Sequence, residues 1–501
     1  MLPATDNLLR DPKSELVFGL VAPVGADLEA LEKDLANQLR HYGYTPNPIR
    51  VSKLMKDVRD LDVELKETTE YERLVSFMDG GNRLREQSGA GEILALWAMA
   101  SIKEKREAES PVLRRTAHIL RSIKHRDEAR ALRAVYGPGF FLIGLSASTA
   151  QKTWSLRQKG LSADQAKEVI RRDASEENDF GQQTRDVFEL ADVYIRQHPE
   201  HVKTTEQLER FLRLVFGAVA ETPTPDEHAM FLAYASSLRS ADLSRQVGAV
   251  VWKDQVGPVA TGCNDVPAPG GGLYWPGPRD RRDHALGVDA NEQHRNEIAD
   301  EVARHVAAEL KLDDAHLDRI RKACGQTRLL DITEFGRPVH AEMDALLSCA
   351  RAGIPTLGAA LFSTTFPCHN CAKHIVASGI RRVVYIEPYV KSQAVQLHGD
   401  AIISDDHGDP GPDDLDLSGG KVVFEPFVGI GPRRYFDLFS MKLSDGYPLK
   451  RKVAGKTAPW EKNGEAVVRV PMIPMSYLDR ESRLAQLVPV VLVPTSSKEK
   501  A

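Results

Sequence analysis

One histidine, one glutamate and two cysteines have the types and spacing of a metal site that performs hydrolytic chemistry. His340 and Glu342 are two residues apart, and Cys368 and Cys371 stand in the segment Pro-Cys-His-Asn-Cys. One imidazole and two thiolates are zinc ligands, and three protein ligands leave the fourth position of a tetrahedral ion to water. Glu342 is not needed as a ligand. We therefore expect its carboxylate to carry protons to and from that water.

The elements predicted around these residues place both ligand sets at the starts of helices. Residues 340–350 carry apolar side chains on one helical face, and residues 368–378 are predicted as a second helix that follows a proline. Strands are predicted over residues 361–365 and 383–386. Because a helix N-terminus favours thiolate over thiol, this arrangement suits a metal. Unrelated core residues and a zinc site without catalysis are the alternatives that these residues leave open.

The pattern H-x-E followed by P-C-x-x-C is a general signature of zinc-dependent nucleobase deaminases. The chain from about residue 226 to residue 440 resembles a deoxycytidylate deaminase. Segment 230–237 is similar to that family's first helix, 246–251 to its first strand and 261–264 to the end of its second strand. With its additional N-terminal half, the whole chain is similar to the bacterial anti-phage dCTP deaminases.

The resemblance assigns roles to residues of this sequence. It implies that His340, Cys368 and Cys371 bind Zn²⁺ and that Glu342 is the catalytic residue. It also implies a deoxycytidine nucleotide substrate, which is deaminated from dCTP to dUTP or from dCMP to dUMP. Asn264 is expected to contact the deoxyribose. The other substrate-binding candidates, each of which could instead serve packing or surface roles, are Arg239, Arg245, Thr365, Tyr389 and Lys391.

Several functions are compatible with such a site. The resemblance favours depletion of dCTP as a defence against phage. The alternatives are a housekeeping dCMP deaminase that supplies dTTP, a polynucleotide cytidine or adenosine deaminase, and a bifunctional deaminase–reductase of the riboflavin type, which the lack of a G-x-G-x-x-G loop disfavours. A nonenzymatic nucleotide-binding regulator is a further alternative, but such a scaffold would not need Glu342.

Composition limits these alternatives. The 501 residues predict two or three domains. The chain has 66 Lys and Arg against 71 Asp and Glu, a formal net charge of −5, which lacks the basic excess typical of proteins that bind nucleic acid. Five cysteines do not form a disulfide framework, and neither an N-terminal signal nor a long apolar run is visible. We therefore expect a cytoplasmic protein without a membrane partner.

The N-terminal half is predicted to be a P-loop-like domain with a doubly wound sheet. Residues 15–22 form a predicted buried strand, and Asp27 is a predicted N-cap of the following helix. Gly19 and Gly25 resemble the glycines of a P-loop. Ala26 and Asp27 stand where the lysine and the Ser/Thr of that loop should follow. Since Asp27 would repel a phosphate, we expect a degenerate loop without phosphoryl transfer.

Further alternating elements extend this half. Strands predicted at 116–123 and 139–146, with a helix at 127–136, imply a mostly parallel sheet. Arg171 and Arg172 join Gly19 and Gly25 as nucleotide-binding candidates, the alternative for the arginines being a solvated helix face. We expect this domain to act as a nucleotide sensor or a brake, through a regulator that is a nucleotide, an RNA or a protein.

Three regions are predicted overall in this α/β protein. They are a regulatory domain over 1–219, a deaminase domain over 227–445 with an insertion at 268–336, and an extension over 446–501 that packs on the body. The deaminase domain is expected to be cytidine-deaminase-like, with α/β/α layers and a mixed five-stranded sheet. His284, His294 and Cys324 in the insertion are candidates for a second metal site, against ordinary surface and core roles. Relatives assemble into multimers, so a homo-oligomer is expected.

Overall fold

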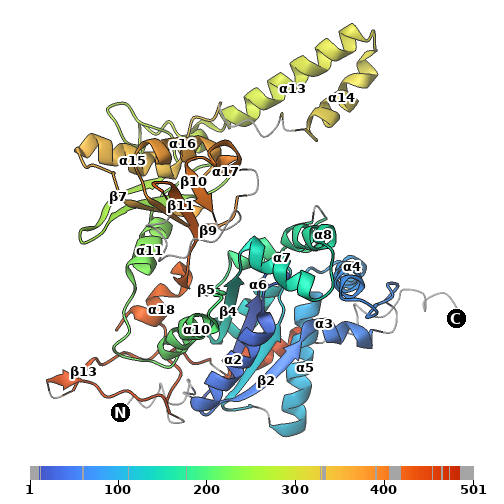
Figure 1. Cartoon of the computed structure of the whole chain (residues 1–501), viewed down its shortest axis with the longest axis vertical. Coiled ribbons are helices and arrows are strands. Elements are labelled where there is room, and N and C mark those ends of the chain that lie inside the picture. The colour runs from blue at the N-terminus through green and yellow to red at the C-terminus, as the bar shows by residue number, and fades with distance from the viewer. Residues whose placement is uncertain are drawn as a thin grey trace. The chain divides into compact units, whose positions relative to one another are not determined.

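The structure is a computed structural model that describes residues 11–485, apart from 12, 59–60, 111, 177, 328, 330–334, 390–391, 405–418, 454, 464–465 and 473 (Figure 1). The described residues form two compact units. The first unit holds the residues up to Glu227 and those from Phe427 onward, and the second holds those between His228 and Pro426. No helix of the described residues is long and apolar enough to span a bilayer.

The first unit contains a six-stranded sheet with strand order β12-β5-β4-β1-β3-β2. The five strands from the N-terminal half are parallel, which confirms the predicted parallel sheet, and β12 is antiparallel to β5. The strands are β1 (Leu16–Val21), β2 (Thr45–Arg50), β3 (Thr116–Arg121), β4 (Phe140–Ser146), β5 (Val193–Arg196) and β12 (Gly429–Ile430).

Helices connect these strands and cover the sheet. Asp27 caps α2 as predicted, since its Oδ1 accepts a hydrogen bond from the Ala30 amide at 3.0 Å. Leu35 of α2 and Phe211 of α10 pack in one core cluster with Phe18 of β1. The helices are α2 (Leu28–His41), α3 (Val51–Leu54), α4 (Glu70–Ser88), α5 (Ile93–Glu109), α6 (Arg126–Tyr136), α7 (Thr149–Gln158), α8 (Ala163–Ala174), α9 (Thr184–Phe188), α10 (His201–Val215), α18 (Tyr435–Phe439) and α19 (Pro474–Ala485).

The second unit is built on a mixed sheet with strand order β10-β11-β9-β8-β6-β7. The sheet has six strands, so the prediction of five was wrong. The additional strand, β10, pairs in parallel with β11. Because β10 has only three residues, it is too short to show a periodic pattern in sequence. The strands are β6 (Gly248–Lys253), β7 (Gly257–Cys263), β8 (Ala360–Thr365), β9 (Arg382–Glu387), β10 (Ile402–Ser404) and β11 (Val422–Pro426).

Two glycines let helices approach opposite faces of this sheet. A Cβ on Gly262 of β7 would lie 2.2 Å from the Ala341 carbonyl oxygen of α15, and one on Gly248 of β6 would lie 1.9 Å from the Ala233 carbonyl oxygen of α11. The close approach of α15 holds the first candidate ligand against the sheet. The helices of this unit are α11 (Pro225–Ser237), α12 (Asp283–Leu286), α13 (Ala290–Glu309), α14 (Leu317–Cys324), α15 (Ala341–Ala352), α16 (His369–Ala377) and α17 (Ala394–Leu397).

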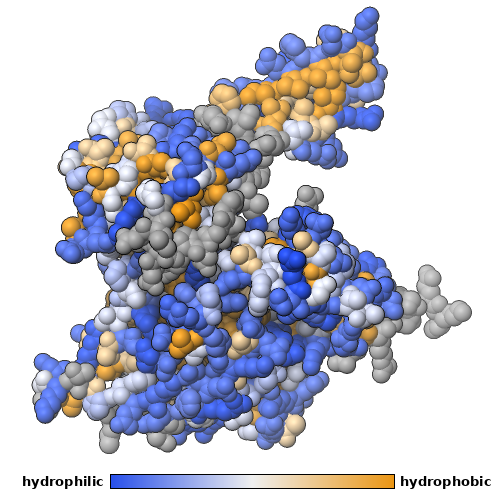
Figure 2. Space-filling view, in the orientation of Figure 1, coloured by the Kyte–Doolittle hydropathy of each residue, from blue (hydrophilic) through white to orange (hydrophobic). Residues whose placement is uncertain are grey.

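The insertion of the second unit is largely helical. Helix α13 packs against α14, and this hairpin extends away from the rest of its unit (Figure 1). Apolar side chains lie along the hairpin in Figure 2. Three alanines of α13 (Ala299, Ala303 and Ala307) are buried.

The second unit ends at Pro426, whereas the deaminase domain was predicted to end at residue 445. Residues from Phe427 onward belong to the first unit, because β12 pairs with β5 and Arg434 forms a buried ion pair with Asp192. In the remaining tail, Tyr477 of α19 donates a hydrogen bond to Glu15 at 2.9 Å. A hairpin of β13 (Lys452–Val453) and β14 (Lys456–Thr457) precedes α19.

Candidate active site

Three candidate metal ligands meet at the starts of two helices of the second unit. His340 is the N-cap of α15, Cys368 is the N-cap of α16, and Cys371 lies in the first turn of α16. The His340 Nδ1 lies 3.3 Å from the Sγ of each cysteine. Ideal tetrahedral zinc bonds would separate nitrogen from sulfur by about 3.6 Å. The donor set and its spacing therefore fit a zinc ion with three protein ligands.

The protonation chemistry of this cluster also suits a cation. A hydrogen bond with Cys371 lowers the pKa of the Cys368 thiol to about 4, and the hydrogen bond with His340 acts in the same direction. A hydrogen bond with Cys368 raises the pKa of His340 to about 9. The three donors thus share protons among themselves. Zinc takes neutral imidazole and thiolate ligands, so binding would release those protons.

Glu342 lies beside the ligands in the first turn of α15. Its side chain is 4% exposed, and Oε2 accepts a hydrogen bond from the Cys371 Sγ at 3.5 Å. Burial raises the pKa of this carboxyl group. A buried carboxyl with a raised pKa, next to a site for an activated water, is suited to accept a proton and to return it.

A cavity of about 910 Å³ opens onto this cluster. His340, Glu342 and Cys368 line it, so a ligand in the cavity reaches both the metal position and the carboxyl group. The structure brings four of the predicted substrate-binding residues to the same cavity, namely Asn264, Arg245, Thr365 and Tyr389.

Hydrogen bonds order this wall of the cavity. The Asn264 Oδ1 accepts from the Val247 amide at 2.7 Å, and its Nδ2 donates to the Arg245 carbonyl oxygen at 2.8 Å. Thr365 Oγ1 donates to one oxygen of Glu387 at 2.9 Å, and Arg245 Nη1 donates to the other at 2.6 Å. Asn264 therefore holds the backbone that carries Arg245, while Glu387 orients its guanidinium.

Arg239 does not line this cavity. Its guanidinium donates to the carbonyl oxygens of Leu273 and Tyr274 and stacks 3.8 Å from the centre of the Trp275 ring. The substrate role expected for Arg239 does not fit this position, because the surrounding loop engages its donors. Lys391 lies outside the described residues.

The remaining candidates do not line the cavity beside the metal cluster. Among the described residues, His284, His294 and Cys324 do not form a metal-ligating group. In the first unit, Gly19 lies inside β1, where a Cβ would contact Phe140, and Arg172 is paired with Asp79 and Glu176. Arg171 is exposed. Of the four nucleotide-binding candidates, Gly25 alone lines the cavity of that unit.

The active-site cavity also has walls that sequence reasoning missed. Asn291 and Arg295 of α13 line it, as do Asp242 and Gln396. The separation of four residues places Asn291 and Arg295 on one face of α13, and that spacing is the sequence signal they carry. No pattern in the sequence around these residues indicates that this face of α13 lines the same cavity as the metal cluster, because that arrangement depends on the tertiary fold.

Comparison with known proteins identifies relatives of this region. Residues 223–387 match the family model of the cytidine and deoxycytidylate deaminase zinc-binding region. ComE operon protein 2 of Bacillus subtilis (strain 168) is 47% identical over 53 residues, which are 11% of this chain and 28% of that protein. Deoxycytidylate deaminase of Enterobacteria phage T2 is 37% identical over 86 residues, which are 17% of this chain and 37% of that protein. The chain thus matches roughly a third of the length of these relatives.

One solved structure also aligns with part of this chain. The crystal structure of dCMP deaminase from the cyanophage S-TIM5 aligns over 41% of this chain and all of that chain, with 20% sequence identity and a TM-score of 0.22.

Proposed function

We propose that this chain hydrolytically deaminates deoxycytidine nucleotides, on the premise that residues 223–387 match the family model of the cytidine and deoxycytidylate deaminase zinc-binding region. The products are ammonia and the corresponding deoxyuridine nucleotide. The observation that carries the proposal is the cluster of His340, Cys368 and Cys371 beside the buried carboxyl of Glu342, in one cavity.

His340, Cys368 and Cys371 would hold the zinc ion. A zinc ion with three protein ligands supplies a water whose pKa is near 7. Glu342 accepts a proton from the attacking water and delivers it to N3 of the cytosine ring. The same carboxylate then takes the proton of the new C4 hydroxyl group and passes it to the 4-amino group, so that the C4 carbonyl forms as ammonia leaves. Burial excludes bulk water from Glu342, so the proton stays with the reacting atoms.

The rest of the cavity would orient the nucleotide. Asn264 lies next to the segment that carries Arg245, and its proposed role is to contact the deoxyribose. Arg245 supplies a cation for phosphate, and Arg295 supplies a second one from α13. Tyr389 lies 5.8 Å from the Arg245 guanidinium, measured to its ring centre, and borders the same end of the cavity.

The proposed substrate is dCTP, with dCMP as the second candidate. A match to phage deoxycytidylate deaminases favours the monophosphate. The resemblance of the whole chain, with its additional N-terminal half, to the bacterial anti-phage dCTP deaminases favours the triphosphate and a defensive role, in which loss of dCTP starves phage DNA synthesis. The N-terminal domain would then restrain the deaminase in uninfected cells, and the functional protein would be a homo-oligomer in the cytoplasm.

A substrate panel tests this proposal. Purified full-length protein should release ammonia from dCTP or dCMP and not from cytosine-bearing oligonucleotides, and the ratio of kcat/KM values ranks the two nucleotides. Turnover of oligonucleotides alone would overturn the proposal. The defensive role predicts that cells expressing the wild-type protein lose dCTP and resist phage, while cells expressing Glu342→Gln do neither. Equal phage resistance with both proteins would reject that role.

A further inference from the structure

A second cavity, of about 810 Å³, opens in the first unit at the carboxyl ends of β1 and β3. Strand β1 lies between β3 and β4 in the sheet, with β3 and β2 on one side of it and β4 and β5 on the other. The strand order therefore reverses direction at β1. In open sheets with parallel strands, ligands bind outside the carboxyl ends of the strands at such a switch point. The position of the cavity is therefore that of a ligand site.

One wall of this cavity is apolar. Leu74, Phe77, Met78 and Gly81 follow the three- and four-residue spacing of one face of α4, and all four line the cavity together with Met55. An apolar stripe that borders an open cavity leaves a surface on which a flat, weakly polar group can pack. A nucleobase has that character.

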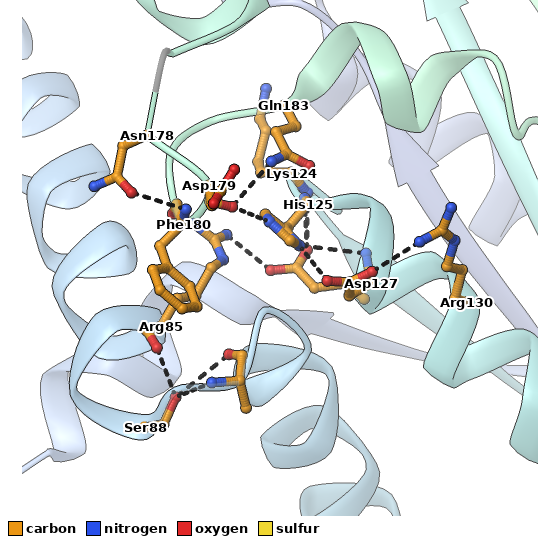
Figure 3. Close-up of polar contacts among 12 residues, drawn as sticks. Arg85, Ser88, Lys124, His125, Asp127, Arg130, Asn178, Asp179, Phe180 and Gln183 are labelled. Atoms are coloured by element: carbon orange, nitrogen blue, oxygen red, sulfur yellow. Dashed lines mark hydrogen bonds and ion pairs between the residues drawn. The ribbon is translucent and has the colours of Figure 1, made fainter. Parts of the chain in front are cut away.

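The other wall is cationic. Eight Lys and Arg side chains line the cavity against five Asp and Glu, which leaves a formal excess of three positive charges. Lys124 donates to the Ala22 carbonyl oxygen at the end of β1 and pairs with the buried Asp173. Arg85 is 1% exposed and pairs with Glu128, and its Nε has no acceptor among the described residues. Figure 3 shows Arg85 and Lys124 from neighbouring elements around His125.

The start of α2 is closed to a phosphate. The Asp27 carboxylate already caps this helix, so an anion would meet a negative charge there. The turn before it packs against α7, because a Cβ on Gly25 would lie 2.7 Å from the Lys152 carbonyl oxygen. A phosphate in this cavity must therefore bind elsewhere.

Arg50 and Arg121 offer the alternative position. Both guanidinium groups share the carboxylate of Glu29, at the long distances of 3.7 and 3.6 Å, and Arg121 also pairs with Glu32 through its other terminal nitrogen at 3.1 Å. Glu29 is half exposed and is also paired with Lys33. Loose, exposed pairs of this kind contribute little, whereas a phosphate between two guanidinium groups forms short, charge-assisted hydrogen bonds. Glu29 thus occupies the place of an anion that a phosphate can take over.

We propose that this cavity binds a nucleoside monophosphate, with its phosphate between Arg50 and Arg121 and its base on the Phe77 face of α4. The site binds the nucleotide without transferring its phosphate, since Asp27 fills the place where a phosphoryl donor would lie. It is separate from the deaminase cavity, and it gives the first unit a ligand of its own.

Equilibrium binding to the full-length protein tests the proposal. The probes are dTMP, dAMP and inorganic phosphate, and their binding is measured by isothermal titration calorimetry. None of the three is a cytosine nucleotide that the protein could deaminate, so the result does not depend on deaminase activity. We expect at least one nucleotide to bind with one site per chain, about tenfold or more tightly than phosphate. Arg50→Gln and Arg121→Gln should each weaken nucleotide binding at least tenfold, and Phe77→Ala should weaken nucleotide binding but not phosphate binding.

Glu29→Gln is the most discriminating variant, because removal of the carboxylate that competes with the phosphate should tighten nucleotide binding several-fold. Two controls should leave binding unchanged. Arg130→Gln removes an exposed guanidinium of α6 that pairs with Asp127 outside the cavity (Figure 3), and Arg245→Ala alters the deaminase cavity. Arg50 is more exposed than Arg121, so its variant keeps the test valid if Arg121→Gln unfolds.

The proposal is overturned if neither nucleotide binds, if the Arg50 variant binds like wild type, or if Glu29→Gln weakens binding. It is equally overturned if Arg245→Ala alone abolishes binding, because the nucleotide would then occupy the deaminase cavity.

Discussion

Replacing Glu342 by glutamine removes the proposed proton carrier with almost no change in volume. The side chain is buried and contacts Cys371, and glutamine has nearly the same shape and size as glutamate. The cluster of His340 and the two cysteines should therefore bind zinc as before. General acid–base catalysis contributes about 10²- to 10⁴-fold to a rate. We expect kcat to fall by that factor, which corresponds to roughly 3–5 kcal/mol of transition-state stabilisation.

Two measurements on the same preparation decide this prediction. The rate of deamination of dCTP and dCMP is followed by ammonia release, and zinc per chain is measured by elemental analysis. The variant should keep the wild-type zinc content and melting temperature, because burial already disfavours the charged form of Glu342. A kcat within tenfold of wild type would refute the proton-carrier role. A loss of zinc together with activity would show that Glu342 supports the metal site instead.

Three further predictions follow from other contacts. Arg295→Ala should raise KM for the nucleotide substrates about tenfold with little change in kcat, while Arg304→Ala, on an exposed part of the same helix, should not; equal KM values would contradict a role of Arg295 in binding. Burial opposes ionisation of Glu15, but hydrogen bonds from His118 and Arg106 outweigh it and lower its pKa from 4.5 to about 2. Because its folded pKa is depressed, on the order of 3 kcal/mol of stability should be present above about pH 5 and lost between about pH 5 and 2. Urea unfolding should show this acid loss in wild type and a shallower one in Glu15→Gln, and identical pH profiles would contradict it. Removal of zinc by a chelator should abolish deamination, and added Zn²⁺ should restore it; activity that survives complete removal would contradict metal dependence.

The metal cluster was predictable because its signals are local. His340 and Glu342 lie within one helical turn, Cys368 and Cys371 within another, and both helices begin where their caps and neighbouring strands predict. Strands β1, β3 and β4 of the first unit were predictable for the same reason, since apolar runs and turn residues mark them in sequence. Strands β2, which contains two prolines, and β5, which has four residues, were not predicted. The start of α2 was predictable because Asp27 is a residue type that caps helix N-termini with its own side chain.

Features that depend on distant contacts were not predictable. Arg239 has the charge of a phosphate ligand, but the loop that brings Trp275 over its guanidinium holds it away from the cavity. Arg295 reaches the cavity because the first turns of α13 border it, which no pattern within α13 records. Strand β12 pairs with β5 across more than two hundred residues of sequence, so its place in the first unit has no local signal.

X-ray absorption at the zinc edge of the purified full-length protein tests the central claim most directly. The account predicts one zinc per chain with two sulfur ligands at about 2.3 Å, one imidazole nitrogen at about 2.0 Å and one further light ligand that a substrate analogue perturbs. A chain without zinc, or a zinc ion with a fourth ligand from the protein, would contradict it.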